Sequence, residues 1–315
     1  MHKAIEKVTT ITSLGGGPIG AGWAAHFLAR GYKVKSFIYK NDERKIYNKI
    51  IKTAWKSLKE IGISENASLD NLSISTDIHE AISDTDFVQE SIPEILNVKR
   101  EFYKLLGAIV PSDIIIASST SGLTMTDIQK SCDTPERTVI GHPFNPPYLL
   151  PLVEIVGGKK TSPLAVNWTK KFYAKAGKEP LVMNKEVPGF IATRLQEALW
   201  REALHMVKSD EATPEQIDTA LKNGPAPRMA VQGQCMAFHV ACGEGGMATN
   251  LDQFGPALKL PWTRLKAPEL TPVLRNKMVD ACNSMAKGKS FEQLAKHRDD
   301  SIVAILKAIK NSEIS

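Results

Sequence analysis

In the first half of the chain, short apolar runs alternate with longer segments of helical spacing. The apolar runs predict strands at residues 8–14, 32–39, 87–90, 114–117 and 138–141. Ile19, Trp23 and Phe27 recur at helical spacing after the first run, and residues 43–61 form a second helical pattern after the next. Strands that alternate with helices are typical of βαβ units, so we expect an α/β domain with a doubly wound, mostly parallel sheet.

The pattern changes at Val187-Pro188-Gly189. Beyond it, clusters of β-branched residues give way to helical spacing, first over residues 191–207 and then over residues 214–221. The sequence therefore predicts an α/β domain over residues 1–187, followed by an all-α domain over residues 188–315. Two clusters of glycine and proline in the second domain predict loops at residues 223–227 and 243–246.

Composition and charge exclude several classes of function. The 315 residues are 43% hydrophobic and 23% charged, a balance typical of globular proteins. No apolar run is long enough to span a bilayer, and the N-terminus lacks the pattern of a signal peptide, so we expect a cytoplasmic protein without membrane association. The net charge is +6, but the lysines are dispersed, which argues against nucleic-acid binding and suits a small anionic cofactor or substrate.

The four cysteines are scattered along the chain and form no C-x-x-C pair. Such a pattern favours reduced, mostly buried thiols over a zinc site or a catalytic thiol. We therefore expect no metal in this protein.

A glycine-rich turn follows the first predicted strand. Gly15, Gly17 and Gly20 occupy the three glycine positions of G-x-G-x-x-G, with a strand before them and a helix after. In a dinucleotide-binding βαβ unit the first glycine permits the tight turn, the second lets the backbone approach a pyrophosphate, and the third lets the helix pack on the strand. Pro18 and Ile19 open the helix, whose free N–H groups face the pyrophosphate. We predict that these five residues bind the cofactor.

The second predicted strand lacks the acid that usually bonds the adenosine ribose at this position. Ile38 stands there, and Asp42 lies beyond the predicted strand end. Lys40 and Arg44 are either solvated surface charges or partners for a 2′-phosphate, which would indicate NADP. The sequence favours NAD and leaves NADP open.

A histidine and an acid form the candidate catalytic pair. His142 follows the predicted strand at residues 138–141, at the carboxyl end where open α/β sheets place their chemistry. Glu154 stands inside an apolar run, where an acid is costly unless it is paired. Pairing orients the imidazole, so His142 suits a base that takes a hydroxyl proton while hydride leaves the same carbon for a nicotinamide. Ser121 and Asn145 are further candidates to bond the substrate oxygen.

Five motifs together resemble the 3-hydroxyacyl-CoA dehydrogenase family, over nearly the whole chain. They are the glycine turn and residues 93–99 (PEILNVK), 118–121 (SSTS), 141–146 (GHPFNP) and 187–191 (VPGFI). The resemblance implies a Rossmann domain for NAD, followed by a helical domain that binds the substrate and forms a homodimer. It implies that His142 is the base, Glu154 its partner and Ser121 a contact of the substrate oxygen. The residues it places beside the cofactor are Glu94, Lys99 and Ser119.

A narrower resemblance is to the branch of this family that oxidises L-carnitine to 3-dehydrocarnitine. The segments that carry it are residues 142–154, 195–203, 243–247 and 253–259. Carnitine carries a quaternary ammonium, which binds aromatic faces, and Phe144 and Phe254 are the candidates for that contact. The residues expected to line the pocket are Gly189, Ile191, Ala192 and Thr193.

Two positions depart from the family pattern and keep alternatives open. Ile38 replaces an aspartate in the cofactor site, and Thr193 replaces an asparagine in the substrate site. A short-chain 3-hydroxyacyl-CoA thioester or L-gulonate are alternative substrates for the same chemistry. A third alternative is a crystallin-like protein that keeps the fold without activity, against which the His142–Glu154 pair argues.

Overall fold

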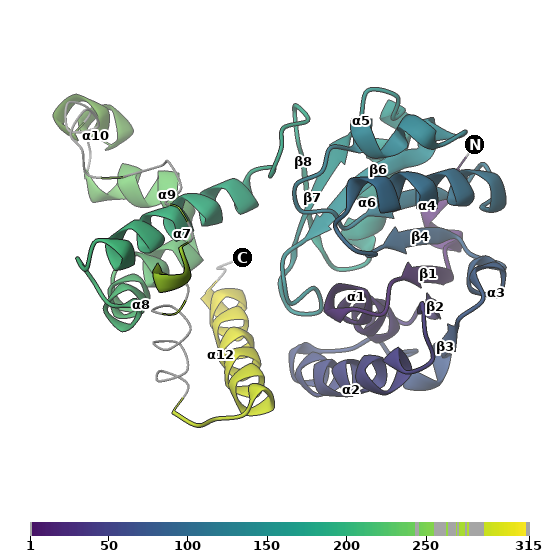
Figure 1. Ribbon diagram of the computed structural model, residues 1–315, viewed down its shortest axis with the longest axis horizontal. Coiled ribbons are helices and arrows are strands. Elements are labelled where there is room, and N and C mark those ends of the chain that lie inside the picture. Colours follow the sequence, from purple (N-terminus) through teal and green to yellow (C-terminus); the bar gives the residue numbers. More distant parts are fainter. Residues whose placement is uncertain are drawn as a thin grey trace. The chain divides into compact units, whose positions relative to one another are not determined.

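The computed structural model describes residues 2–242, 246–254, 263, 269, 271–274, 276 and 287–312. The chain divides into two compact units, Met1–Thr193 and Arg194–Ser315. Figure 1 shows the sheet and its helices in the first unit and a group of helices in the second. The division falls a few residues after the boundary that the sequence predicts.

An eight-stranded sheet organises the first unit, in the order β3-β2-β1-β4-β5-β6-β7-β8. The strands are β1 (Thr10–Leu14), β2 (Lys33–Phe37), β3 (Leu72–Ser75), β4 (Phe87–Glu90), β5 (Ile115–Ser118), β6 (Thr138–Pro143), β7 (Leu152–Gly157) and β8 (Glu179–Val182). All neighbouring pairs are parallel except β6 and β7, which are antiparallel. The strand order reverses between β1 and β4, and this is where such sheets bind nucleotides.

Helices connect these strands. They are α1 (Pro18–Ala29), α2 (Glu43–Ile61), α3 (Ile78–Ile82), α4 (Leu96–Ile109), α5 (Met125–Ile128) and α6 (Pro163–Lys175), with single 3-10 turns at Ile5–Lys7, Leu69–Asn71, Gln129–Ser131 and Pro135–Arg137. From Gly20 to its last residue α1 is buried on every side, as expected for a helix without a polar face. The amphipathic helix α2 lies beside α1 and buries one stripe that includes Tyr47, Ile51 and Leu58 (Figure 1).

One face of the sheet is covered by α4 and α5. Its buried cluster includes the strand residues Leu14, Val88, Ile116 and Ile140 and the helix residues Tyr103, Leu106, Met125 and Ile128. Successive side chains of a strand point to opposite faces, so Phe87 and Gln89 of β4 point away from this cluster.

The other face is covered by α1 and α6 through packed aromatic rings. The ring of Phe87 lies 4.2 Å from that of Phe172 in α6, and Trp23 of α1 stacks on Tyr173 at 5.5 Å. Aromatic pairs at such distances add to the free energy of burial. Helices therefore cover both faces, and the predicted doubly wound, mostly parallel α/β fold is confirmed.

The described part of the second unit is helical, as predicted. Its helices are α7 (Ala192–Lys208), α8 (Pro214–Asn223), α9 (Pro225–Ala241), α10 (Gly246–Phe254) and α12 (Phe291–Ser312). The predicted loop at residues 223–227 is wrong, because Pro225 begins α9 and only Gly224 separates it from α8. Proline has no N–H to lose in the first turn and so starts a helix readily. Of the predicted loop at residues 243–246, Gly246 begins α10 and the other residues lie outside the described part.

Among the helices of the described residues, none combines the length and the apolar character that crossing a membrane requires.

Candidate active site

Four predicted site segments follow four neighbouring strands of the sheet. The glycine turn follows β1, Glu94 follows β4, Ser119 to Ser121 follow β5, and His142 lies near the end of β6. These strands are adjacent and parallel in the order β1-β4-β5-β6. Their carboxyl ends therefore form one edge, along which the segments lie side by side.

The three glycines of the turn have different steric surroundings. Gly15 has a φ of 123°, and a Cβ there would lie 2.4 Å from the carbonyl oxygen of Ser91. A Cβ on Gly20 would lie 2.1 Å from the carbonyl oxygen of Gly15, so both positions require glycine for the chain itself. A Cβ on Gly17 would meet no atom within 4 Å. The space above Gly17 is thus open at the start of α1, where Pro18 and Ile19 stand, and this suits a pyrophosphate.

His142 and Glu154 face each other across the antiparallel ladder of β6 and β7. His142 Nδ1 lies 2.9 Å from Glu154 Oε2, and both side chains are buried. The other oxygen of Glu154, Oε1, accepts hydrogen bonds of 2.9 Å from the backbone N–H groups of Ile191 and Ala192. The carboxylate thus also binds the N-terminus of α7, where free N–H groups and the helix dipole favour negative charge.

These contacts fix the protonation of the pair. Burial raises the pKa of Glu154, but the hydrogen bonds from His142 and from the Ala192 and Ile191 amides outweigh it, and the pKa lies below its ordinary value. An ionised carboxylate only accepts hydrogen bonds, so Nδ1 of His142 must carry the proton of their bond. In the neutral imidazole Nε2 then holds the lone pair, and within the described part of the chain Nε2 has no hydrogen-bond partner.

Two aromatic rings flank the imidazole. The ring of Phe144 lies 5.7 Å from that of His142, edge to face, and the ring of Phe190 lies 5.3 Å away. Phe190 is buried and has a positive φ of 49°, next to Gly189 with a φ of 73°. This turn brings Ile191 and Ala192, two of the predicted pocket residues, to Glu154.

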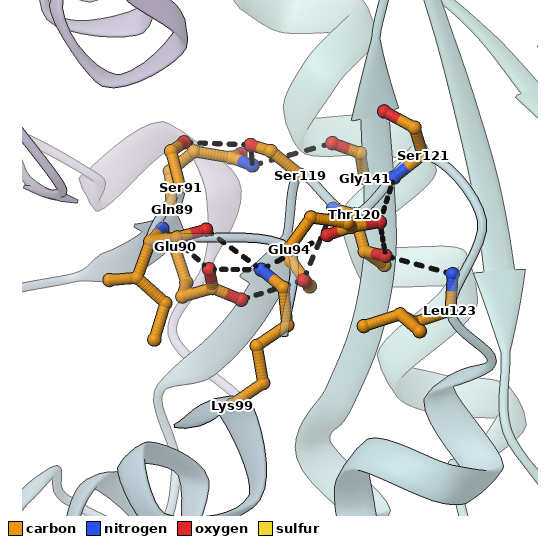
Figure 2. A network of polar contacts seen from close by, with 12 residues as sticks. Gln89, Glu90, Ser91, Glu94, Lys99, Ser119, Thr120, Ser121, Leu123 and Gly141 are labelled. Carbon is orange, nitrogen blue, oxygen red and sulfur yellow. Dashed lines mark hydrogen bonds and ion pairs between the residues drawn. The ribbon is translucent and has the colours of Figure 1, made fainter. Parts of the chain in front are cut away.

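Ser119 is the centre of a hydrogen-bond network on β4 and β5. Its hydroxyl is 3.1 Å from Trp23 Nε1. It is also 2.8 Å from Gln89 Nε2 and 2.8 Å from Ser91 Oγ (Figure 2). Gln89 also accepts from Tyr173 and donates to the carbonyl oxygen of Gly141, next to His142. The hydroxyl of Ser119 is therefore fully used inside the protein, where it ties the glycine-turn helix to β4 and β6.

Glu94 organises the loop that carries Ser121. Its Oε1 accepts hydrogen bonds from Thr120 Oγ1 at 2.5 Å and from the N–H group of Ser121 at 2.9 Å (Figure 2). It also accepts from the N–H group of Gly122 at 3.2 Å. Ser121 is exposed, and in Figure 2 its hydroxyl points away from Glu94. The loop is thus held by its backbone and by the Thr120 side chain, and the Ser121 hydroxyl, which has no hydrogen-bond partner among the described residues, is available to a ligand.

Lys99 forms a buried ion pair with Glu90, a residue that the sequence analysis did not single out. Lys99 Nζ lies 2.6 Å from Glu90 Oε1 and 3.6 Å from Glu94 Oε2. Glu90 also accepts from the Ile92 N–H and from Ser118 Oγ. Because its ammonium is enclosed by these partners, Lys99 positions Glu94 and the chain after β4.

The segment after His142 contains Asn145, which is exposed and precedes a cis peptide bond to Pro146. Its side-chain amide has no hydrogen-bond partner among the described residues. The buried Lys178, between α6 and β8, donates to the carbonyl oxygens of Pro147 and Leu150. Burial, with help from the charge of Arg30, lowers the pKa of Lys178 to about 7.

The other two predicted substrate residues, Thr193 and Phe254, belong to the helices α7 and α10. Thr193 is half-buried in the first turn of α7. Phe254 is the last residue of α10, and its side chain lies outside the described part of the structure. Within that part, no group of histidine, cysteine, aspartate and glutamate could hold a metal ion.

The chain matches two family models in succession. Residues 10–187 match the NAD-binding domain of 3-hydroxyacyl-CoA dehydrogenase, and residues 189–291 match its C-terminal domain. The chain belongs to the 3-hydroxyacyl-CoA dehydrogenase family. It is therefore an NAD-dependent dehydrogenase, and the predictions of family, enzyme class and cofactor are confirmed.

Similar proteins cover almost the full length of this dehydrogenase. It is 50% identical to an L-carnitine dehydrogenase of Streptomyces griseus subsp. griseus, over 97% of this chain and 91% of that protein. It is 44% identical to an L-carnitine dehydrogenase of Pseudomonas putida, over 99% of this chain and 97% of that protein.

Among solved structures, the dehydrogenase is similar to 5-formyl-3-hydroxy-2-methylpyridine 4-carboxylic acid 5-dehydrogenase, described as an NAD+-dependent dismutase. The TM-score is 0.82 at 25% identity, over 97% of this chain and 100% of that one. An (S)-3-hydroxybutyryl-CoA dehydrogenase from Ralstonia eutropha matches with a TM-score of 0.62 at 26% identity, over 72% of this chain and 82% of that one.

Proposed function

We propose that this dehydrogenase oxidises the 3-hydroxyl group of L-carnitine to the ketone of 3-dehydrocarnitine and reduces NAD to NADH. The name of its relatives at 43–50% identity supports the choice of substrate. The observation that carries the chemistry is the pair of His142 and Glu154, in which Nδ1 is bound and Nε2 is available.

In the proposed mechanism, Nε2 of His142 accepts the proton of the substrate hydroxyl. The two electrons of the C3–H bond leave as hydride, so that the C3–O bond becomes a carbonyl. NAD supplies the hydride acceptor. Glu154 keeps the proton on Nδ1, holds the ring in place and stabilises the imidazolium that forms.

Other residues bind and orient the substrate. Ser121 and Asn145, whose polar groups are exposed at the ends of β5 and β6, bond the reacting oxygen. Phe144, beside the imidazole, offers an aromatic face to the trimethylammonium, and Phe254 is the second candidate for this contact. The pocket is further lined by Gly189, Ile191, Ala192 and Thr193.

For the cofactor, we propose that the pyrophosphate lies over Gly17, against the first free N–H groups of α1 at Ile19 and Gly20, while Pro18 begins the helix. Glu94 belongs to the nicotinamide side of the site, because it follows β4, which lies between β1 and β5, and Lys99 positions it from α4. Ser119 contributes by fixing Trp23 and Gln89.

The substrate assignment is tested by the absorbance of NADH at 340 nm. The purified protein is offered L-carnitine, 3-hydroxybutyryl-CoA or L-gulonate, each with NAD. We expect the highest kcat/KM with L-carnitine. Turnover of the CoA ester or of gulonate without turnover of carnitine would reassign the substrate, and a protein that binds NADH but oxidises none of the three would support a non-enzymatic role.

We also propose that the enzyme is a cytoplasmic homodimer formed through its helical domain. On α7 the side chains of Leu195, Leu199 and Trp200 are 63%, 52% and 46% exposed, an apolar surface suited to a second copy. Size-exclusion chromatography with light scattering checks this. A monomeric mass at micromolar concentration would contradict it.

A further inference from the structure

The adenosine side of the cofactor site has no acid where the sequence pattern places one. Ile38, directly after β2, is fully buried and therefore presents no group to a ribose. Asp42 is exposed at the start of α2. Arg44, a candidate partner for a 2′-phosphate, donates instead to the carbonyl oxygen of Ile74 in β3 at 2.9 Å.

A different carboxylate reaches the glycine turn. Glu43 is the first residue of α2, and its side chain lies over Gly16, the residue between the first two glycines of the motif. A Cβ on Gly16 would lie 2.3 Å from Glu43 Oε2 and 3.0 Å from Cδ, so Gly16 provides the room for this carboxylate. The turn and the start of α2 are neighbours because Gly15 N–H donates to the carbonyl oxygen of Phe37, the last residue of β2.

The contacts of Glu43 hold one oxygen and leave the other for a ligand. Oε2 accepts a hydrogen bond of 3.1 Å from the backbone N–H of Tyr39. Oε1 has no hydrogen-bond partner among the described residues. The start of a 19-residue helix favours an ionised carboxylate, because of the free N–H groups and the dipole there.

We propose that Glu43 binds the adenosine ribose of NAD and selects NAD over NADP, in place of the acid missing at Ile38. This inference rests on the proposed position of NAD on the glycine turn. A carboxylate accepts hydrogen bonds from the 2′- and 3′-hydroxyls of the ribose. The same charge repels a 2′-phosphate, so one residue both attracts NAD and rejects NADP.

The test measures the binding of NADH and NADPH to the full chain by calorimetry. It compares wild type with the isosteric variant Glu43→Gln. We expect wild type to bind NADH more tightly than NADPH. In the variant the dissociation constant for NADH rises roughly tenfold, as for the loss of a charged hydrogen-bond partner. NADPH binding does not weaken, so the preference for NADH shrinks by at least that factor.

Asp42→Asn is the matched control, because it removes the same charge from the adjacent, exposed residue. It should leave both dissociation constants unchanged. An equal loss of NADH and NADPH binding in Glu43→Gln would mean that Glu43 only supports the turn, and would overturn the proposal. So would an unchanged preference, or the same change in the control. If the wild-type protein binds neither dinucleotide, the proposed binding of NAD to the glycine turn is refuted instead.

Discussion

The ammonium group of Lys99 lies 2.6 Å from the carboxylate of Glu90, and the two side chains are 1% and 0% exposed. The ammonium group of Lys99 also lies 3.6 Å from the carboxylate of Glu94. Glu90 is the last residue of β4, and the strand order of the sheet reverses between β4 and β1. The ion pair therefore ties the interior of the fold to the proposed nicotinamide side of the site.

Breaking this ion pair should destabilise the protein strongly. Lys99→Met leaves the carboxylate of Glu90 buried and without its cation, and we expect the free energy of unfolding to fall by about 3–5 kcal/mol. The double variant Glu90→Gln with Lys99→Met removes both charges and should recover part of the loss. Urea unfolding followed by circular dichroism measures both effects. A single variant as stable as wild type would show that the pair is not buried as described.

Glu154→Gln should lower turnover through the tautomer of His142. The amide oxygen can still accept from Ile191 and Ala192, but then the amide NH2 faces Nδ1 and forces it to accept. The proton moves to Nε2, which can no longer act as a base, so we expect kcat to fall by about 10²–10⁴-fold. His142→Ala should show a loss of the same order. NADH affinity, measured by fluorescence, should stay near wild type in both, and a parallel loss of affinity would indicate a structural role.

Two glycines of the turn should respond differently to the same added methyl group. In Gly20→Ala the new Cβ meets the carbonyl oxygen of Gly15, and we expect a loss of at least about 2 kcal/mol of stability. Gly17 has a φ of −79°, which alanine adopts freely, and the space above it is open. Gly17→Ala should therefore keep the unfolding temperature and weaken NADH binding by about tenfold or more. Unchanged NADH affinity in this variant would place the pyrophosphate elsewhere.

Lys178 should give the protein a stability that rises with pH above neutrality. Its pKa in the folded protein is about 7, because of burial and the charge of Arg30, and thus lies below that of an ordinary lysine. At pH values between these two the unfolded chain binds a proton that the folded chain lacks. The free energy of unfolding therefore increases with pH in that window, by at most about 1.4 kcal/mol per pH unit.

Comparison of the unfolding temperatures of wild type and Lys178→Met between about pH 7.5 and 9.5 isolates this contribution. The variant lacks the titrating group, so its dependence on pH should be flatter than that of wild type. It also leaves the carbonyl oxygens of Pro147 and Leu150 without their donor, which lowers stability at every pH but does not change the slope. Identical slopes would show that Lys178 keeps an ordinary pKa.

The elements that the sequence predicted well are those with strong local signals. The helix at residues 43–61 and the strand at residues 87–90 agree with α2 and β4 to the residue. The strands β3 and β8 were not predicted, because they form the two edges of the sheet and are only partly buried, without a continuous apolar run. Pro180 in β8 also argues against a strand when the sequence is read alone, although proline is tolerated in an edge strand such as β8.

The site residues that the sequence missed depend on contacts between distant segments. Glu90 did carry a local signal, an acid that ends a buried apolar strand, which is the reasoning that singled out Glu154. Glu43 carried none, because the spacing rule looks for an acid at the strand end and the structure supplies it from the next helix. The roles of Gln89 and Lys178 likewise cannot be predicted from the sequence, because their hydrogen bonds join segments that meet only in the packed fold.

The antiparallel pairing of β6 and β7 holds the catalytic pair on the strands, apart from the connection between them that carries candidate substrate contacts. Backbone hydrogen bonds on both sides set His142 opposite Glu154, and a slip of one residue would turn the acid to the other face of the sheet. The connection at residues 144–151 carries Phe144 and Asn145, which are proposed to meet the substrate, but neither residue of the catalytic pair. Substitutions that keep its length can therefore change which alcohol is bound and leave His142 opposite Glu154.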